Sequence, residues 1–455
     1  MSLEIIVLAA GQGTRMRSAL PKVLHTLAGR PLLTHVLETA RRLKPRHLHI
    51  VIGAGAQEVQ DYYRDWSDLD WVEQDKQLGT GHAVGEALPR VADEATVLAL
   101  YGDVPLIAVD TLNACVEASA GGIALVTTDM ADPSGFGRIV RETDGRIVAI
   151  VEDRDVDDAQ RAIREINTGI LAAPAKLLRE LIDALSADNA QGEYYLTDVI
   201  AAAEARGLKV AGLKAGCPEE VAGVNDRAQL AELERYYHRI QAARLMREGV
   251  TLRDPARIDV RGTLQAGVDT IIDVNVVFEG RVVLGRNVSI GPNSYIRDAV
   301  LDDGVIVESN TVIDGAKIAR GAVIGPFARI RPGTELGEAV RIGNFVETKK
   351  AKLGAGTKAS HLAYLGDAQL GEDCNVGAGT ITCNYDGVHK HRTDIGDGVF
   401  IGTNSTLVAP LTIDDQAYIG AGSTITEKVE SEDLAIGRAR QRNVKGWTPP
   451  AKRET

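Results

Sequence analysis

Short apolar runs alternate with amphipathic segments over the first half of the chain. Runs rich in Ile, Val and Leu, as expected for buried strands, lie at 4–10, 47–53, 96–101, 123–127 and 146–152. Segments with helical spacing, such as 31–42 and 110–118, lie between them. Strands that alternate with helices predict parallel β-α-β units, with helices on both faces of a sheet and a site at the carboxyl ends of the strands. The expected fold of this half is therefore a Rossmann-like α/β domain.

One long amphipathic helix is predicted over 226–248, which contains no internal proline and no glycine. Apolar side chains recur on one face of this segment, at Leu230, Leu233, Tyr237, Ile240 and Leu245. A long helix between two differently patterned halves is most simply a rigid connector.

The second half has a period of six. Six fits a short strand followed by a tight turn that glycine permits, with one apolar side chain per repeat in a narrow core, and is the hexapeptide signature of a parallel β-helix. The periodic positions are Ile272, Phe278, Leu284, Ile290 and Ile296, then Val300, Ile306, Val312, Ile318, Ile324, Ile330, Leu336 and Ile342, then Leu370, Val376 and Thr382, then Ile395, Ile401, Leu407, Ile413, Ile419 and Ile425.

The period fails between Ile342 and Leu370 and again between Thr382 and Ile395. The second gap contains 383–392, which is too polar for a core. Departures from a strict repeat are where loops and functional residues are expected. The patterns together predict an N-terminal domain over 1–226, a helical linker over 227–248, and a β-helix domain over 249–455 that ends in a tail.

Composition narrows the class of protein. The 455 residues carry a formal net charge of −12, which argues against a nucleic-acid or anionic-membrane binder. The four cysteines are scattered without a C-x-x-C pair, so neither a disulfide framework nor a zinc site is indicated. A run of about twenty apolar residues is absent, and so is a signal-peptide pattern. We therefore expect a cytoplasmic protein without a membrane span.

A candidate phosphate site follows the first strand. Gly11 and Gly13 permit close approach of backbone N–H groups to phosphate oxygens, and Arg15 and Lys22 place two cations beside that turn. The spacing is not that of a Walker A loop. Asp103 ends another strand in Tyr-Gly-Asp and is well placed to hold Mg²⁺. Capping of a turn before Pro105 is an equal alternative for Asp103.

The motif L-x-A-G-x-G-T-R-M…P-K with the downstream Y-G-D resembles the sugar-phosphate nucleotidyltransferases. The similarity continues through Gln74, 78–82, 135–138, Glu152, 165–169, 193–198 and 223–225. With the helix and the hexapeptide half, essentially the whole chain is similar to one bacterial family, the bifunctional N-acetylglucosamine-1-phosphate uridylyltransferases and glucosamine-1-phosphate N-acetyltransferases.

This resemblance implies roles for residues of the first half. Arg15 and Lys22 would be catalytic and stabilise triphosphate charge, and Asp103 with Asn225 would hold Mg²⁺. The sugar phosphate would attack the α-phosphorus of UTP and release pyrophosphate, a reaction that depends on positioning and charge neutralisation. The implied UTP and UDP-sugar contacts are Leu8, Ala9, Ala10, Gly11, Lys22, Gln74, Gly79, Thr80, Tyr101, Gly102, Asp103, Gly137, Glu152, Asn167 and Asn225.

In the second half, His361 lies inside the first gap of the period. Arg331, Lys349 and Asp367 are eighteen residues apart and would stack as a column in a coil of three repeats, unless the gap shifts the phase. A solvated charged edge is the alternative for that column. The family resemblance implies that His361 is the general base that deprotonates the amine of glucosamine-1-phosphate.

The resemblance also implies binding residues and an assembly. Sugar-phosphate contacts would be Arg331, Lys349, Tyr364 and Asn375, and acetyl-CoA contacts would be Ala378, Asn384, Tyr385, Thr403, Ala421 and Arg438. The family's β-helix is left-handed and forms a homotrimer. Its substrates are acetyl-CoA, glucosamine-1-phosphate, UTP and N-acetylglucosamine-1-phosphate, and its product, UDP-N-acetylglucosamine, is a precursor of peptidoglycan and lipopolysaccharide.

Two other functions fit the same two-part plan. One is a single-activity sugar-phosphate nucleotidyltransferase whose β-helix is a scaffold or binds an effector. The imidazole of His361 argues against it, since a scaffold needs none there. The other is a non-catalytic regulatory protein, which could have lost the cations of the phosphate site, whereas Arg15 and Lys22 are present.

Overall fold

The computed structural model describes residues 2–53, 55–189 and 191–449. The chain divides into two compact units, Met1–Tyr237 and His238–Thr455. Helix α7 (Arg227–Arg247) contributes residues to both units. The expected domain limits at 226 and 248, and the connector role of this helix, stay predictions.

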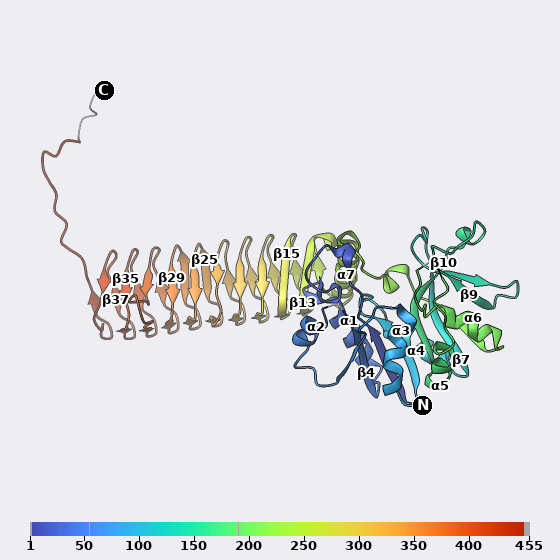
Figure 1. Ribbon diagram of the computed structural model, residues 1–455. Helices are drawn as coiled ribbons and strands as arrows, with labels where there is room; N and C mark the ends of the chain where they lie inside the picture. Colours follow the sequence, from blue (N-terminus) through green and yellow to red (C-terminus); the bar gives the residue numbers. More distant parts are fainter. Residues whose placement is uncertain (1, 54, 190, 450–455) are drawn as a thin grey trace, which may run out of the picture. The chain divides into compact units, whose positions relative to one another are not determined.

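A sheet flanked by helices forms the first unit (Figure 1). The strand order is β11-β7-β10-β6-β1-β4-β5, with β8 and β9 attached at β10. The strands are β1 (Leu3–Leu8), β2 (Thr26–Leu27), β3 (Arg30–Pro31), β4 (His47–Ile52), β5 (Leu69–Glu73), β6 (Thr96–Tyr101), β7 (Gly122–Asp129), β8 (Arg138–Arg141), β9 (Ile147–Val151), β10 (Glu165–Pro174) and β11 (Lys209–Lys214). The α-helices of this unit are α1 (Leu32–Arg42), α2 (Ala56–Tyr62), α3 (Thr80–Ala87), α4 (Val109–Ala118), α5 (Ala175–Ile182) and α6 (Asp198–Ala205), with short 3₁₀ turns η1 (Thr14–Met16), η2 (Lys22–Leu24), η3 (Leu88–Arg90), η4 (Gln160–Ala162) and η5 (Pro218–Val221).

Helices cover both faces of this sheet, as the sequence predicted. Successive residues of a strand point to opposite faces. Ile5 and Val7 of β1 share a core with Val36 of α1 and Leu112 of α4. Ile6 shares the opposite core with residues of α3, α5 and α6. Burial on both faces explains why these strands are continuous apolar runs rather than alternating ones.

The sheet is not all-parallel, in contrast to the prediction. β1 pairs in parallel with β4 and β6, but β10 runs antiparallel between β6 and β7. The chain reaches β10 through the antiparallel pair β8–β9 rather than through a crossover helix. As a result the beginning of β10, with Asn167 and Thr168, lies at the edge where the carboxyl end of β6 lies.

A buried polar cluster lies at the opposite, amino-terminal edge of the sheet. Glu4 and His49 are almost fully buried. His49 Nε2 lies 3.0 Å from Glu4 Oε2, and His49 Nδ1 lies 2.7 Å from Asp70 Oδ2. Arg90 Nη1 donates to Asp70 Oδ1 at 2.6 Å. Each ring nitrogen therefore has a carboxylate partner, as a buried imidazole requires.

Stacked coils of three short strands form the second unit, a parallel β-helix (Figure 1). We call its faces A, B and C in chain order, and name each edge by the two faces it joins. Face A contains β12 (Thr251–Leu252), β14 (Ile271–Ile272), β16 (Ser289–Ile290), β19 (Ile306–Val307), β22 (Val323–Ile324), β25 (Arg341–Asn344), β28 (Lys358–His361), β31 (Asn375–Val376), β34 (Phe400–Ile401), β37 (Tyr418–Ile419) and β39 (Leu434–Ala435). A 3₁₀ turn, η6 (Pro255–Arg257), follows β12.

Faces B and C form one continuous sheet. Two long strands, β13 (Ile258–Ala266) and β15 (Val276–Leu284), run across both faces. Face B continues with β17 (Tyr295–Arg297), β20 (Val312–Asp314), β23 (Arg329–Ile330), β26 (Glu347–Lys349), β29 (Tyr364–Gly366), β32 (Ile381–Cys383), β35 (Thr406–Val408) and β38 (Thr424–Ile425). Face C continues with β18 (Val300–Leu301), β21 (Lys317–Ile318), β24 (Glu335–Leu336), β27 (Lys352–Leu353), β30 (Ala368–Leu370), β33 (Thr393–Ile395) and β36 (Leu411–Ile413).

Part of the predicted six-residue series is wrong by one position. Val300, Ile306 and Val312 are 41%, 39% and 38% exposed. The residues that follow them, Leu301, Val307 and Ile313, are buried in the core instead. Each of these three repeats has two adjacent apolar residues, so the apolar pattern alone did not indicate which of the two is buried. The phase shifts because some repeats have five residues, as between Ile296 and Leu301.

The first predicted gap of the period is also wrong. Thr348, Leu353, Ala359 and Leu365 continue the buried series between Ile342 and Leu370. The sequence pattern did not reveal this continuation, because Thr348 and Ala359 are not strongly apolar and two of the repeats have five residues. His361 therefore ends a regular strand, β28, and does not lie at an interruption.

The second gap is a real insertion. Tyr364 pairs with Ile381, 17 residues on, whereas Ile381 pairs with Thr406, 25 residues on. The added segment, 384–392, leaves the helix at the B–C edge after β32.

The predicted apolar face of α7 is partly wrong. Leu233 and Leu245 are buried, but Ile240 is 41% exposed. His238 and Ala242 are buried instead. The helix therefore buries Leu245 near its end as predicted, but in its middle it buries His238 and Ala242 rather than Ile240.

The buried Glu4–His49 pair generates a stability prediction. His49→Ala leaves the Glu4 carboxylate buried without its imidazole partner, which is expected to lower the free energy of unfolding by about 3 kcal/mol. Urea denaturation followed by circular dichroism measures it. His47→Ala is the matched control, because His47 is exposed on the same strand. Equal stability of the two variants would contradict the assigned role of the pair.

Candidate active sites

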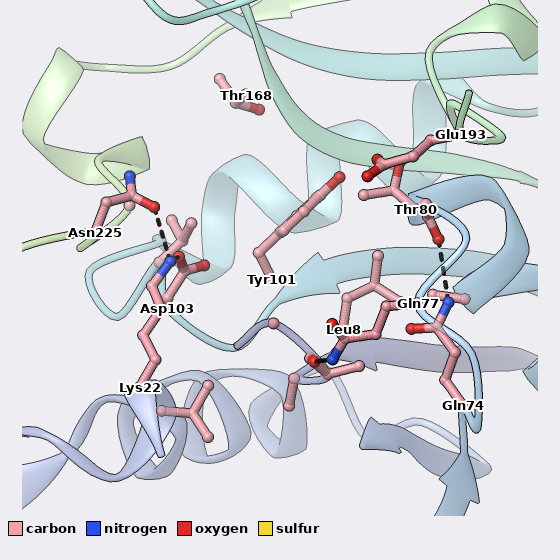
Figure 2. A pocket seen from close by; sticks show the side chains of 18 of the residues that line it. Leu8, Lys22, Gln74, Gln77, Thr80, Tyr101, Asp103, Thr168, Glu193 and Asn225 are labelled. Atoms are coloured by element: carbon pink, nitrogen blue, oxygen red, sulfur yellow. Dashed lines mark hydrogen bonds and ion pairs between the residues drawn. The ribbon is translucent and has the colours of Figure 1, made fainter. Parts of the chain in front are cut away.

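A cavity of about 410 Å³ lies at the carboxyl ends of β1 and β6 in the first unit (Figure 2). This is the edge at which a doubly wound sheet is expected to bind its ligand. Eleven of the predicted residues line it, namely Leu8, Ala9, Ala10, Gly11, Lys22, Gln74, Gly79, Thr80, Tyr101, Asp103 and Asn225.

One side of the cavity is formed by Lys22, Asp103 and Asn225 (Figure 2). Lys22 begins η2, Asp103 follows β6, and Asn225 precedes α7. Lys22 Nζ donates to Asn225 Oδ1 at 2.8 Å and forms an ion pair with Asp103. The side chains of Lys22 and Asp103 are only 13% and 15% exposed, so their charges are weakly screened by solvent. Segments far apart in the sequence thus place one cation between two oxygen ligands.

The carboxylate and amide oxygens of Asp103 and Asn225 both face the ammonium group of Lys22. Oxygen atoms of this kind are the ligands that Mg²⁺ prefers. Within 2–53, 55–189 and 191–449, the structure contains no cluster of three or more His, Cys, Asp or Glu side chains that could hold a metal alone. A metal at this cavity would therefore need further oxygen ligands from a bound phosphate or from water.

Amide side chains form the other side of the cavity. Gln74 is buried, and its Nε2 donates to the carbonyl of Gly79 at 3.2 Å. Gly79 has φ +110°, and a Cβ there would lie 2.5 Å from the Tyr194 carbonyl oxygen, so only glycine fits. Gln77, which the sequence analysis missed, donates from Nε2 to the carbonyl of Ala10 at 2.6 Å.

Tyr101 lies between these two sides (Figure 2). Burial and the nearby Glu152 carboxylate raise its pKa far above its ordinary value. A Cβ at Gly169 would overlap the Tyr101 ring, which makes glycine necessary at that φ of +83°. Tyr101 therefore stays a neutral hydroxyl that packs against the beginning of β10.

Three predicted sugar contacts, Gly137, Glu152 and Asn167, lie together beside the cavity but do not line it. The Asn167 N–H donates to the Gly137 carbonyl at 2.8 Å. A Cβ at Gly137 would lie 3.4 Å from Glu152 Oε1. Burial raises the pKa of Glu152, and a hydrogen bond from Thr197 at 3.0 Å opposes that shift.

Two further predicted residues do not line the cavity. Arg15 is exposed on η1, and Gly102 is buried, with its N–H donating to the Leu8 carbonyl at 2.9 Å. Thr168, Glu193 and Gly223 line the cavity although no role was assigned to them. They belong to the segments 165–169, 193–198 and 223–225, in which the sequence resembles the nucleotidyltransferases, so that resemblance was the available signal. Gln77 lies outside these segments.

The second unit places several predicted residues in one column. The core residues Ala359, Val376, Ile401 and Ile419 of face A are register partners, so the residues two positions later also stack. Those residues at the A–B edge are His361, Ala378, Thr403 and Ala421.

Backbone hydrogen bonds connect this column from coil to coil. The Asn404 N–H donates to the Ala378 carbonyl at 2.7 Å, and the Gly422 N–H donates to the Thr403 carbonyl at 2.8 Å. Arg438 lies against the next position, because a Cβ at Gly422 would be 3.9 Å from its Cδ. Imidazole, hydroxyl and guanidinium groups are thus aligned along one exposed edge.

A second group of predicted residues lies at the other margin of face B. Lys349 Nζ lies 3.2 Å from Asp367 Oδ2, and Asn384 Nδ2 donates to the same carboxylate oxygen. Arg331 Nη1 donates to Glu347 Oε1 at 2.7 Å. The eighteen-residue column is only partly confirmed, since Lys349 pairs in register with Gly366 and reaches Asp367 through its side chain.

Lys390, which the sequence analysis did not assign, joins this second group. The neighbouring Lys349 side chain lowers the pKa of Lys390, because its positive charge disfavours a second ammonium group beside it. Two ammonium groups side by side favour an anion between them. The polar character of the insertion was the only signal in the sequence.

The structure does not bring all predicted acetyl-site residues together within one chain. His361 precedes β29 at the A–B edge, whereas Asn384 and Tyr385 follow β32 at the B–C edge. Tyr364 lies on face B between them, and Asn375 lies on face A. The two edges are separated by face B of the β-helix, because every coil passes through its three faces in the same order.

None of the helices in the described part of the chain combines the length and apolar character that crossing a membrane requires.

Family models match three parts of the chain. A MobA-like NTP transferase domain matches residues 5–194, a GMPPB C-terminal domain matches 261–355, and a bacterial transferase hexapeptide (six repeats) matches 392–427. These matches support the expected Rossmann-like nucleotidyltransferase fold and the hexapeptide left-handed β-helix.

Curated relatives are similar over the full length. The Bifunctional protein GlmU of Marinobacter nauticus is 56% identical over 99% of both chains, that of Pseudomonas entomophila is 55% identical over 99% of both, and that of Stutzerimonas stutzeri is 56% identical over 100% of both. The similarity to these relatives therefore extends over both units of the chain. The chain therefore belongs to the family of bifunctional GlmU proteins and is a transferase with two activities.

Proposed function

We propose that the chain makes UDP-N-acetylglucosamine in two steps, with one site in each unit. The second unit transfers an acetyl group from acetyl-CoA to glucosamine-1-phosphate. The first unit transfers a uridylyl group from UTP to N-acetylglucosamine-1-phosphate. The proposal rests on one polar arrangement in each unit. In the first unit Lys22 lies between Asp103 and Asn225, and in the second unit His361 stacks in one column with Ala378.

In the uridylyl step, a phosphate oxygen of the sugar phosphate attacks the α-phosphorus of UTP. The new oxygen–phosphorus bond forms as the bond to pyrophosphate breaks, so the chain has to position two anions and neutralise their charge. Lys22 supplies a weakly screened positive charge to the phosphates, and Arg15 supplies a second from η1. Bound Mg²⁺, held by Asp103 and Asn225, would supply further charge neutralisation.

The remaining groups would select the two substrates. Gln74 and the backbone around Gly79 offer hydrogen-bonding groups to the uracil edge and the ribose. Gly137, Glu152 and Asn167, beside the cavity, would bind the N-acetyl sugar. Glu152 is suited to a sugar hydroxyl because Thr197 occupies only one of its oxygens in the structure.

In the acetyl step, His361 accepts a proton from the amine of glucosamine-1-phosphate. The amine nitrogen attacks the thioester carbonyl carbon, the carbon–nitrogen bond forms, and the carbon–sulfur bond breaks. The leaving thiolate takes the proton from His361 and departs as the thiol of coenzyme A. The column of Ala378, Thr403 and Ala421 would carry the extended coenzyme, with Arg438 at a coenzyme phosphate. Arg331, Lys349 and Lys390 would bind the sugar phosphate, with Tyr364 and Asn375 at the sugar, and the insertion residues Asn384 and Tyr385 would complete the coenzyme site.

The same surface supports assembly into a homotrimer. Phe327, Phe345 and Leu362 are exposed and occupy successive coils of the A–B edge, each with positive φ. Bulky apolar residues are unfavourable in that backbone region and in water, so their presence at three stacked positions favours burial against a second copy. This ridge adjoins His361, and contact between copies would bring other residues toward it.

Removal of the divalent metal is expected to separate the two activities. In the presence of EDTA, pyrophosphate release should fall at least about 100-fold while thiol release continues, because only the first site depends on metal charge. Coupled assays for the two products measure this, and excess Mg²⁺ should restore the first. Asp103→Ala should lose pyrophosphate release, unlike Asp110→Ala, which changes an exposed residue of α4. Pyrophosphate release that survives both EDTA and Asp103→Ala would contradict the metal assignment.

His361→Ala is expected to lower thiol release by about 10² to 10⁴-fold, the usual contribution of a general base. Pyrophosphate release from UTP and N-acetylglucosamine-1-phosphate should be unchanged. Lys22→Ala serves as the reciprocal variant, since it should lose only pyrophosphate release. If the unaltered protein never releases thiol, the β-helix is a scaffold and the acetyl-site assignments are wrong.

Phe345→Asp is expected to convert a trimer to a monomer, because a charge would be buried in the contact between copies. Light scattering coupled to gel filtration measures the mass. Val268→Asp, an exposed apolar position outside the ridge, is the control. A trimer that persists in Phe345→Asp would argue against the ridge as the interface.

A further inference from the structure

The insertion 384–392 has a fold of its own that requires explanation. Tyr385 and Lys390 form an antiparallel bridge, and the His391 N–H donates to the Asn384 carbonyl at 2.8 Å. The insertion is therefore a small hairpin at the B–C edge. Its apolar side chains, Tyr385 and Val388, are 58% and 75% exposed, so apolar packing does not hold it in place.

Asp386 is the centre of the polar contacts within this hairpin. Its Oδ1 accepts hydrogen bonds from the N–H groups of Val388 at 2.8 Å and His389 at 2.6 Å. Its Oδ2 lies 2.7 Å from His391 Nε2 on the returning strand. These donors lower the pKa of Asp386 to about 2, so it is a carboxylate at neutral pH.

Two residues of the hairpin face the second group of predicted site residues. Asn384 donates to Asp367, and Lys390 lies against Lys349. Lys390 immediately precedes His391, so a contact that fixes His391 also fixes the backbone from which the Lys390 ammonium group extends. The Asp386–His391 contact is thus connected to the site through the adjacent residue, Lys390.

We propose that the Asp386–His391 contact is a clasp that positions the hairpin, so that Lys390 faces the sugar phosphate and Asn384 faces the coenzyme. Both members are positioning residues, because neither is assigned a contact with the reacting atoms. The inference rests on the proposed acetyl-transfer function, and it adds to that function the element that holds one wall of the site.

The test is steady-state kinetics of thiol release by the full-length protein. His391→Ala is expected to raise KM for glucosamine-1-phosphate about fivefold to tenfold, the effect of losing one charge-assisted hydrogen bond, while kcat changes less than about twofold. His391→Gln should restore most of the affinity, since its amide can donate to Asp386. Pyrophosphate release, from the other unit, should be unchanged in every variant.

His389→Ala is the matched control. His389 is in the same hairpin, but its Nδ1 is 3.9 Å from Asp386 Oδ2 and its side chain is 76% exposed. Its KM should equal that of the unaltered protein. A double-mutant cycle with Asp386→Ala distinguishes a clasp from direct contact of His391 with ligand, because members of a clasp give non-additive losses.

Three results would overturn the clasp. They are an unchanged KM in His391→Ala, an equal rise in His389→Ala, or additive effects of His391→Ala and Asp386→Ala. Failure of the proposed function is distinguishable from these, since the unaltered protein would then release no thiol from acetyl-CoA and glucosamine-1-phosphate.

Discussion

Parallel strand pairing in fixed register is the constraint on which both candidate sites depend. In the first unit it brings the carboxyl ends of β1 and β6 to one edge, so that Gly11 and Asp103 face the same cavity. In the second unit it stacks residues one coil apart, which aligns His361 with Ala378 and Thr403. Parallel pairing requires crossovers, so residues far apart in sequence meet without any local motif joining them.

The two sites use charge in different ways. Lys22 is shielded from solvent and lies between two oxygen-bearing side chains, an arrangement suited to a polyanion whose charge must be neutralised. The β-helix instead offers cations along an exposed margin, where Lys349 and Lys390 lie side by side. The residues proposed for acetyl transfer lie along an edge of the β-helix and in its insertion, so the position of the insertion bears directly on that site.

The sequence predicted the two fold classes and most of the first cavity, because strand runs, glycine turns and motif spacing are local signals. The features that the sequence did not predict depend on contacts between residues far apart in the chain. Val300 and Leu301 are both apolar, so only the five-residue repeat decides which is buried. The antiparallel direction of β10 follows from the β8–β9 pair, of which only β9 was predicted as an apolar run. Gln77 enters the site through a backbone carbonyl that any residue could offer. The separation of His361 from Asn384 by one face requires the coil geometry itself.

The measurement that tests the central claim most directly follows an isotopic label through both sites. The full-length protein would be supplied with acetyl-CoA carrying a ¹³C-labelled acetyl group, glucosamine-1-phosphate, UTP and Mg²⁺, and the nucleotide sugar would be analysed by mass spectrometry. The account predicts a UDP-sugar that contains one labelled acetyl group for each uridylyl group. Absence of label from every UDP-sugar formed, or a UDP-sugar without an acetyl group, would contradict the claim that one chain performs both transfers.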